Sequence, residues 1–147
     1  MATGLLGQEL RMTGRILADF IGPWRLERRI EHADGTQARF TGQALWQPEG
    51  TGALYLETGD MRLDGGAVFR AERRYRWDAG LNVFFDDGRF FHTVPPQGGA
   101  AAHWCAPDQY DVEYDFGQWS GLQTGWQTRW RVRGPRKDYV MTSDYCR

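Results

Sequence analysis

A chain of 147 residues with seven Trp, six Tyr and eight Phe is long enough to bury the core of one domain without disulfide or metal staples. Its formal net charge of −1 supplies no overall field to attract nucleic acid or an anionic membrane, so neither partner is expected. No apolar run is long enough to span a bilayer.

The N-terminus lacks the basic start and unbroken apolar core of a signal peptide, so we expect a cytoplasmic protein. The two cysteines, Cys105 and Cys146, have no zinc-type spacing and are too few for a disulfide scaffold. Reduced thiols are therefore expected, and whether the two meet in space stays open.

The first 21 residues carry the helical pattern of the chain. Apolar residues recur at helical spacing between Gly7 and Phe20, with charged residues opposite, and Gly22-Pro23 ends the pattern. We expect a short N-terminal helix that lies across one end of the following structure.

Residues 22–147 alternate repeatedly between apolar and polar positions, which predicts β-strands. The turns between them are short, as at Asp34-Gly35 and Asp64-Gly65-Gly66. The pattern favours an antiparallel up-and-down barrel or a sandwich, within a single domain of residues 1–147. The expected strands cover residues 24–31, 40–46, 53–61, 67–77, 81–94 (a hairpin), 110–116, 126–132 and 137–145.

Two of the later strands carry opposite charges on their outer faces, one acidic and one basic. Antiparallel pairing would match these charges and leave the aromatic residues inside. A nucleic-acid surface on the arginines is the alternative, but neighbouring carboxylates cancel the field that phosphates need. The expected cross-strand pairs are Asp115 with Arg129, Glu113 with Arg131, Asp111 with Arg133, Tyr114 with Trp130 and Val112 with Val132.

The hairpin at residues 81–94 has Asp87-Gly88 at its centre, which predicts a two-residue turn because Gly takes positive φ cheaply. This turn would place Phe85 opposite Phe90 and Phe84 opposite Phe91. His92 would then share the inner face with Phe85 and Phe90.

Three polar residues fall on faces that are otherwise apolar: Arg28, Arg73 and His92. A buried guanidinium has to meet a carboxylate, carbonyls, water or an anionic ligand, unless a bulge turns it outward. Glu57 is the candidate partner if it faces inward with Tyr55, although the neighbouring leucines compete for that face. Since one carboxylate cannot neutralise two arginines, at least one of them would face a water-filled or ligand-filled cavity.

His92 and His103 also permit a haem or metal hypothesis, but neither lies in a cluster with ligand spacing. His103 stands near Cys105 and Asp108, so a Cys–His nucleophilic pair is a further alternative, without an orienting motif. A core or rim histidine is the ordinary interpretation, and we expect neither a metal nor a cofactor.

Six segments of the chain together resemble a family of small lipocalin-like proteins of bacteria and plants, described as a domain of unknown function. The resemblance implies a calycin-type, lipocalin-like barrel with a ligand cavity, and it implies no established activity. The segments are Gly22-Pro23-Trp24-Arg25-Leu26-Glu27-Arg28, Tyr55-Leu56-Glu57-Thr58-Gly59, Arg74-Tyr75-Arg76-Trp77, Asp87-Gly88-Arg89-Phe90-Phe91-His92, His103-Trp104-Cys105 through Asp108-Gln109-Tyr110, and Gly134-Pro135-Arg136-Lys137-Asp138-Tyr139.

The chain is also distantly similar to fatty-acid-binding proteins and nitrobindins. The former hold a carboxylate with an Arg-x-Tyr pair on the last strand, whereas this chain has Tyr145-Cys146-Arg147, in reversed order. The nitrobindin histidine has no counterpart, because no His follows His103.

We expect a binding module for a small, partly apolar, anionic ligand inside the barrel rather than an enzyme, with the oligomeric state open. One alternative is a small enzyme that uses His92 as acid or base in the same cavity. Two further alternatives are a haem or metal carrier, and an interaction domain whose interior is filled by its own side chains. Gly42 and Ala44 on an inner face argue against the filled interior, because such small residues indicate open space. The residues expected to contact the ligand are Trp24, Arg28, Glu57, Arg73, Tyr75, Trp77, His92 and Trp130.

Overall fold

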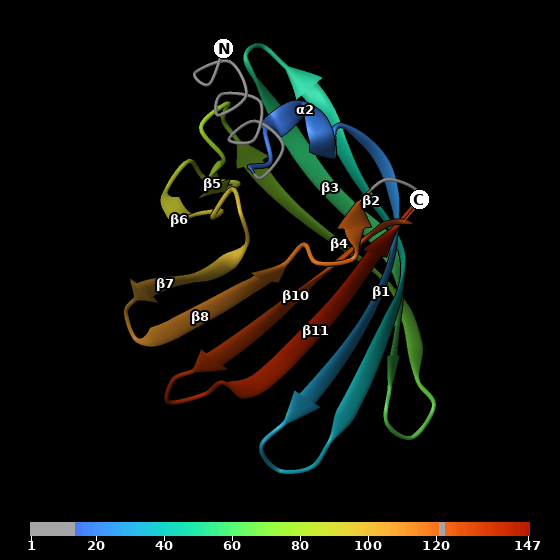
Figure 1. Cartoon of the computed structure of the whole chain (residues 1–147). Coiled ribbons are helices and arrows are strands. Elements are labelled where there is room, and N and C mark those ends of the chain that lie inside the picture. Colours follow the sequence, from blue (N-terminus) through green and yellow to red (C-terminus); the bar gives the residue numbers. More distant parts are fainter. Residues whose placement is uncertain (1–13, 121–122) are drawn as a thin grey trace, which may run out of the picture.

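The computed structural model describes residues 14–120 and 123–147, and most of these residues form antiparallel strands (Figure 1). Of the helix predicted over residues 7–20, the described part contains the helix Leu17–Phe20, and residues 7–13 lie outside the described part. The elements are α2 Leu17–Phe20, β1 Gly22–His32, β2 Gln37–Glu49, β3 Gly52–Leu63, β4 Val68–Trp77, β5 Asn82–Phe85, β6 Phe90–Thr93, β7 Gly99–Cys105, β8 Asp108–Asp115, β9 Trp119–Ser120, β10 Gln123–Arg133 and β11 Asp138–Cys146.

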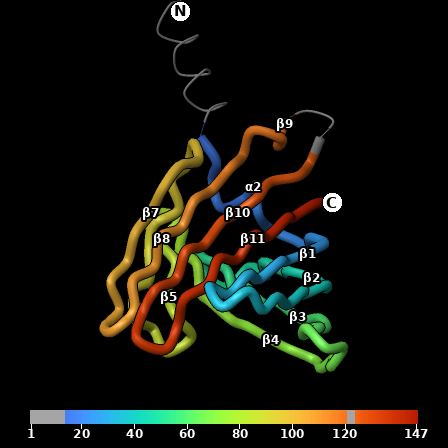
Figure 2. Tube along the Cα trace, turned by 90° about the horizontal axis from the view of Figure 1, so that it is seen from below, coloured from blue at the N-terminus to red at the C-terminus, as the bar shows by residue number. Residues whose placement is uncertain are grey.

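The strands follow the order β6-β5-β4-β3-β2-β1-β11-β10-β8-β7, and β9 pairs with the start of β10. Chain neighbours therefore lie side by side, and β11 returns to β1. The sheet curls on itself into a nearly closed barrel, as the view along it shows (Figure 2). This confirms the predicted all-β antiparallel barrel with a short helix. Within the described residues, no strand pairing joins β6 to β7, and we call this place the seam.

The alternation of side chains decides which face of each strand is buried. On β1, Trp24, Leu26, Arg28 and Ile30 face the interior and the residues between them are exposed, as predicted. On β3 the sequence left open which residues face the interior. Tyr55 and Glu57 do so and are buried, while Leu54 and Leu56 are only half-buried.

One end of the barrel is closed by α2, which we call the capped end (Figure 1). Phe20 of α2 is completely buried and packs against an aromatic cluster. The Trp24 indole donates a hydrogen bond of 2.8 Å to the Phe20 carbonyl and so ties the helix to β1. The ring centres around Phe20 lie at 5.7 Å for Trp46, 5.1 Å for Trp77, 5.1 Å for Trp119 and 5.4 Å for Trp126.

The opposite end, which we call the open end, is less covered. On β4, only Tyr75, Arg76 and Trp77 pair with β5, so no described strand flanks residues 68–74 of β4 on that side. Inward side chains of β4 become more exposed along this stretch, from 6% at Trp77 to 49% at Phe69, with Arg73 and Tyr75 half-buried between them. The inner face of the barrel is therefore accessible here.

Gly42 and Gly59 lie opposite each other on β2 and β3, where the two backbones approach very closely. A Cβ atom on Gly42 would lie 2.1 Å from the Thr58 carbonyl oxygen, and one on Gly59 would lie 2.3 Å from that of Thr41. Glycine at both positions lets the sheet bend sharply. The expectation that Gly42 marks open space is wrong, because the backbone of β3 fills that space.

The charged strands β8 and β10 pair antiparallel, as predicted, but the predicted register is wrong by two residues. Arg129 lies opposite Glu113, and Arg131 lies opposite Asp111. A shift of two residues leaves every side chain on its predicted face. Arg131 finds its closest carboxylate on β11 instead, at Asp138, 2.7 Å away.

The hairpin between β5 and β6 also differs from the prediction. The Phe85 amide bonds to the Arg89 carbonyl at 2.8 Å, which encloses a three-residue loop instead of a two-residue turn. Phe84 lies opposite Phe90, and a register shift between Val83 and Phe84 interrupts the pairing. Phe90 is consequently 49% exposed, while Phe91 and His92 are both buried.

Candidate functional site

Arg28 is neutralised inside the barrel by a carboxylate and also bonds to a hydroxyl. Its Nη1 and Nη2 donate to Glu57 Oε1 and Oε2, each at 2.7 Å, and its Nε donates to Ser143 Oγ at 2.7 Å. Both ion-pair side chains are 4% exposed. Bidentate pairing of this kind neutralises the charge of the guanidinium, so Arg28 does not need an anionic ligand as counter-ion.

The charge states of this pair follow from their mutual attraction. Burial works against each charge, but the neighbouring Arg28 charge and its hydrogen bonds leave the pKa of Glu57 below its ordinary value. In the same way, burial opposes the Arg28 charge, and Glu57 more than compensates, so the pKa of Arg28 is raised. Both groups are therefore ionised at neutral pH.

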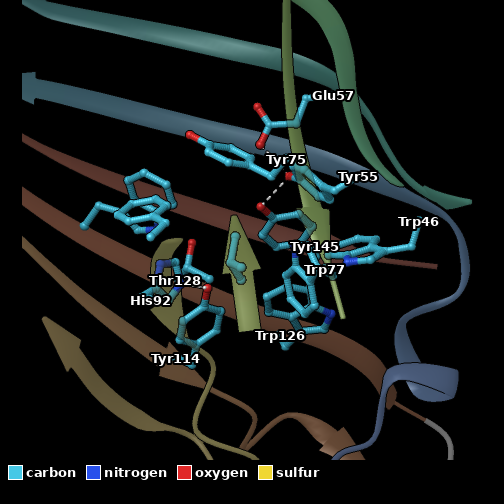
Figure 3. A pocket seen from close by; sticks show the side chains of 13 residues that line it. Trp46, Tyr55, Glu57, Tyr75, Trp77, His92, Tyr114, Trp126, Thr128 and Tyr145 are labelled. Carbon is cyan, nitrogen blue, oxygen red and sulfur yellow. Dashed lines mark hydrogen bonds between the residues drawn. The ribbon is translucent and has the colours of Figure 1, made fainter. Parts of the chain in front are cut away.

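Two tyrosine hydroxyls extend this network toward the centre of the barrel. Tyr55 donates to Glu57 Oε2, and its oxygen also lies 2.9 Å from the Tyr145 hydroxyl (Figure 3). Burial raises the pKa of Tyr145 to about 12, so its phenol keeps its proton. The network is thus a hydrogen-bonded chain that runs from Ser143 through Arg28, Glu57 and Tyr55 to Tyr145, with Glu57 as a carboxylate and Tyr145 as a neutral phenol.

Arg73 differs from Arg28, although both face inward. It lies directly opposite Glu57 in the pairing of β3 with β4, yet the carboxylate is held by Arg28. Among the described residues, no carboxylate lies within salt-bridge distance of Arg73. Its guanidinium carbon lies 5.9 Å from the centre of the Trp130 ring. Arg73 is therefore a half-buried cation beside an aromatic ring at the open end.

His92 is buried on the other side of the interior. Its Nε2 lies 2.7 Å from the Tyr114 hydroxyl, and its Nδ1 has no partner among the described residues. Burial, together with the nearby His103, lowers the pKa of His92 to about 4. The imidazole is accordingly neutral at pH 7, which suits a hydrogen-bonding group or a base.

The other chemistry-bearing residues do not assemble into a site. His103 is half-buried between the rings of Phe85, Phe90 and Phe91. Cys105 and Cys146 are both free thiols. Among the described residues, no group of three or more His, Cys, Asp or Glu side chains is placed to hold a metal ion. Nor is any helix in residues 14–120 and 123–147 both long and apolar enough to cross a membrane.

Aromatic side chains line an internal cavity between the two polar groups, with Glu57 at one side and His92 at the other (Figure 3). The cavity volume is about 20 Å³, which admits roughly one water molecule. The ligand cavity of a few hundred Å³ that the sequence led us to expect is therefore not present between these rings. The lining residues are Trp46, Tyr55, Glu57, Tyr75, Trp77, Val83, Phe91, His92, Tyr114, Trp126, Thr128, Trp130 and Tyr145.

Five of the eight residues expected to contact a ligand line this cavity: Glu57, Tyr75, Trp77, His92 and Trp130. Trp24 does not, because it is buried in the capped end, and neither arginine is part of the lining. Tyr55 and Tyr145 were absent from that expected set. The alternation at Tyr55 left its face open and Tyr145 was not assigned to a face, and the folded structure shows that both extend the Glu57 network.

Comparison with known proteins supports the fold more than any activity. Residues 20–147 match the model of a family of unknown function, DUF6314, and no curated protein matches the chain. An S-type phycobiliprotein lyase, CPES, from Guillardia theta has a TM-score of 0.57 at 8% identity, over 89% of this chain and 89% of the lyase. A de novo designed fluorescence-activating β-barrel has a TM-score of 0.42 at 11% identity, over 89% of this chain and 95% of the design. At this identity the lyase establishes a shared barrel fold alone.

Proposed function

Because the chain belongs to the DUF6314 family, whose function is unknown, we propose from the geometry alone that it is a binding module for a small, partly apolar, anionic molecule. The ligand enters at the open end of the barrel and meets Arg73. This proposal keeps the lipocalin-like and cytoplasmic character expected from the sequence.

The observation that carries the proposal is the unbalanced charge of Arg73. Of the two inward arginines, Arg28 holds the carboxylate of Glu57, and Arg73 has no carboxylate within salt-bridge distance in residues 14–120 and 123–147, which leaves its guanidinium for water or a ligand. A carboxylate or phosphate would form charge-assisted hydrogen bonds with this guanidinium. The adjacent rings of Tyr75 and Trp130 supply contact for an apolar body.

The small cavity sets a condition on binding. Small-molecule sites have volumes of about 300–1,000 Å³, far above the 20 Å³ found between the rings. The ligand must therefore displace rings at the open end, and Tyr75 and Trp130 are suited to this because both are only half-buried. Binding is expected to change the fluorescence of Trp130.

The test compares 2-naphthoate with 2-naphthalenemethanol, which have similar size and differ in charge, by isothermal titration calorimetry. We expect the anion to bind more tightly, and Arg73→Met to weaken its binding by about 1–3 kcal/mol, the scale of a charged hydrogen bond. The alcohol should not respond to that substitution. Arg70→Met is the matched control, because Arg70 lies on the same strand but pairs with Asp60 on the outer face. Equal affinities of the two probes would remove the role of Arg73, and absence of binding would refute the proposal.

A second candidate function is an enzyme in the same interior, with His92 as acid or base. The specific observation in its favour is the buried contact of 2.7 Å between His92 and the Tyr114 hydroxyl beside the cavity. This hypothesis requires a turnover that disappears in His92→Ala. Binding that survives in His92→Ala without any turnover would favour the binding module.

A further inference from the structure

The interior contains unused hydrogen-bonding groups that the arginines do not explain. Among residues 14–120 and 123–147, three buried side-chain atoms lack a partner: Trp46 Nε1, Trp126 Nε1 and His92 Nδ1. All three residues line the same cavity (Figure 3). The buried Trp24 indole differs, since it donates to the Phe20 carbonyl at 2.8 Å.

The two indoles lie close together, with ring centres 5.8 Å apart. An indole nitrogen is a donor and never an acceptor, so both call for an oxygen that accepts. A buried donor without a partner is expensive, and native structures seldom leave such groups unmatched. Two such donors around one cavity indicate a place for an acceptor.

The surroundings favour a carbonyl or carboxylate oxygen over a water molecule. A water that accepts from both indoles also needs acceptors for its own two hydrogens. The rings that contact both indoles are Phe20, Trp24 and Tyr145, and of these only Tyr145 carries an oxygen. Because Tyr55 donates to Glu57, Tyr145 donates to Tyr55, and its oxygen can accept one hydrogen of such a water but not both. A carbonyl oxygen accepts two hydrogen bonds and donates none, so it leaves nothing unmatched.

We infer that the cavity is a site for the carbonyl or carboxylate oxygen of an apolar ligand, which accepts hydrogen bonds from Trp46 and Trp126. The inference rests on the proposed function, because the ligand has to enter the barrel. It specifies that the ligand carries an acceptor oxygen for the two indoles as well as the anionic group for Arg73. The cavity volume of about 20 Å³ suits a single oxygen atom. The apolar body extends from it toward the open end and takes the place of the movable rings.

The experiment compares acetophenone with α-methylstyrene, two neutral molecules of the same shape in which C=CH2 replaces C=O. The indole N–H signals of the ¹⁵N-labelled protein report the contact, and Trp46→Phe and Trp126→Phe assign them. We expect acetophenone to move both signals downfield and to bind about 3- to 10-fold more tightly than α-methylstyrene, as one or two net hydrogen bonds allow. The signal of Trp104, which is 61% exposed, should stay in place.

The variants give a second readout. Trp126→Phe keeps a ring but loses the donor, so acetophenone should bind about 3-fold more weakly while α-methylstyrene is unaffected. Trp104→Phe is the matched control and should change neither affinity. If Trp126→Phe does not fold, the comparison of the two probes on the unchanged protein still decides.

Equal affinities of the two probes, or a bound water that holds both indoles and that acetophenone does not displace, would overturn the inference. The proposed function fails separately. If 2-naphthoate binds through Arg73 while acetophenone shows no advantage, only the acceptor site is wrong. If acetophenone binds equally well to Arg73→Met and moves the indole signals, while 2-naphthoate shows no preference for the unchanged protein, the acceptor site is supported and the anion-binding function is not. If no probe enters the barrel, both proposals fall.

Discussion

Replacing Glu57 by Gln removes the charge that neutralises Arg28 while it preserves the size of the side chain. Arg28 stays buried with its hydrogen bond to Ser143 and at most one of the two bonds that now join it to Glu57. Breaking one partner of a buried ion pair costs about 3–5 kcal/mol, because the remaining charge is left uncompensated. We expect a loss of about 3–4 kcal/mol in the free energy of unfolding, since the amide oxygen still accepts one bond.

Urea denaturation followed by tryptophan fluorescence measures this loss, and two further variants interpret it. Asp60→Asn breaks the Asp60–Arg70 pair, whose side chains are 57% and 72% exposed, and should cost less than about 1 kcal/mol. The double variant Arg28→Met/Glu57→Met removes both charges and should be more stable than Glu57→Gln by about 1–4 kcal/mol. Two results would contradict this explanation: a loss below about 1 kcal/mol for Glu57→Gln, or a double variant that is no more stable than Glu57→Gln. Either would show that the uncompensated charge of Arg28 is not the cause of the instability.

Three other outcomes follow from the structure. Because the pKa of His92 is lowered to about 4, the unfolded chain takes up a proton before the folded one as the pH falls below about 6.5, and the free energy of unfolding should decline by up to about 3 kcal/mol by pH 4. His92→Gln should abolish most of that decline and the exposed His32→Gln should not, so an unchanged decline in His92→Gln would contradict the assignment. Arg131→Glu should reduce the stability in urea by only about 0.5–1 kcal/mol, because its pair with Asp138 is partly exposed, and a loss several times larger would mean a buried contact. Gly59→Ala places a Cβ atom 2.3 Å from a backbone oxygen and should lower the free energy of unfolding in urea by about 2–3 kcal/mol. Gly125→Ala, whose Cβ atom would have its nearest neighbour at 3.4 Å, should lower it by under about 1 kcal/mol, and similar losses in the two variants would argue against the close approach of β2 and β3.

The faces of the strands could be predicted from the sequence, because the two-residue period alone decides which side chains point inward. That logic placed Arg28 and Trp24 correctly inside β1. The register of β8 against β10 could not be predicted in the same way. Three acidic residues facing three basic ones remain largely matched after a shift of two residues, and exposed pairs differ by only a few tenths of a kcal/mol.

The contacts within the candidate site could not be predicted from the sequence, because they join residues of different strands. Glu57 neighbours Arg73 in the strand pairing but bonds to Arg28 from another strand, a choice that strand periodicity does not determine. The burial of both Phe91 and His92 depends on the irregular pairing of β5 with β6, which breaks the alternation that the prediction used. The filled interior likewise depends on how large rings from many strands meet, and composition predicted only that such rings exist.

The seam between β6 and β7 means that, in the described part of the chain, hydrogen bonds between strands do not run all the way round the barrel. In a barrel whose hydrogen bonds run all the way round, the number and stagger of the strands set the diameter. This barrel differs, because β6 and β7, the two end strands of the sheet, meet without a ladder in the described part of the chain. Spreading the barrel needs only side-chain contacts such as that of Phe90 with His103 to separate, 6.3 Å between ring centres. We therefore expect amide hydrogen exchange to be fastest along β6 and β7, the two edges of this seam, and slowest where β1 meets β11.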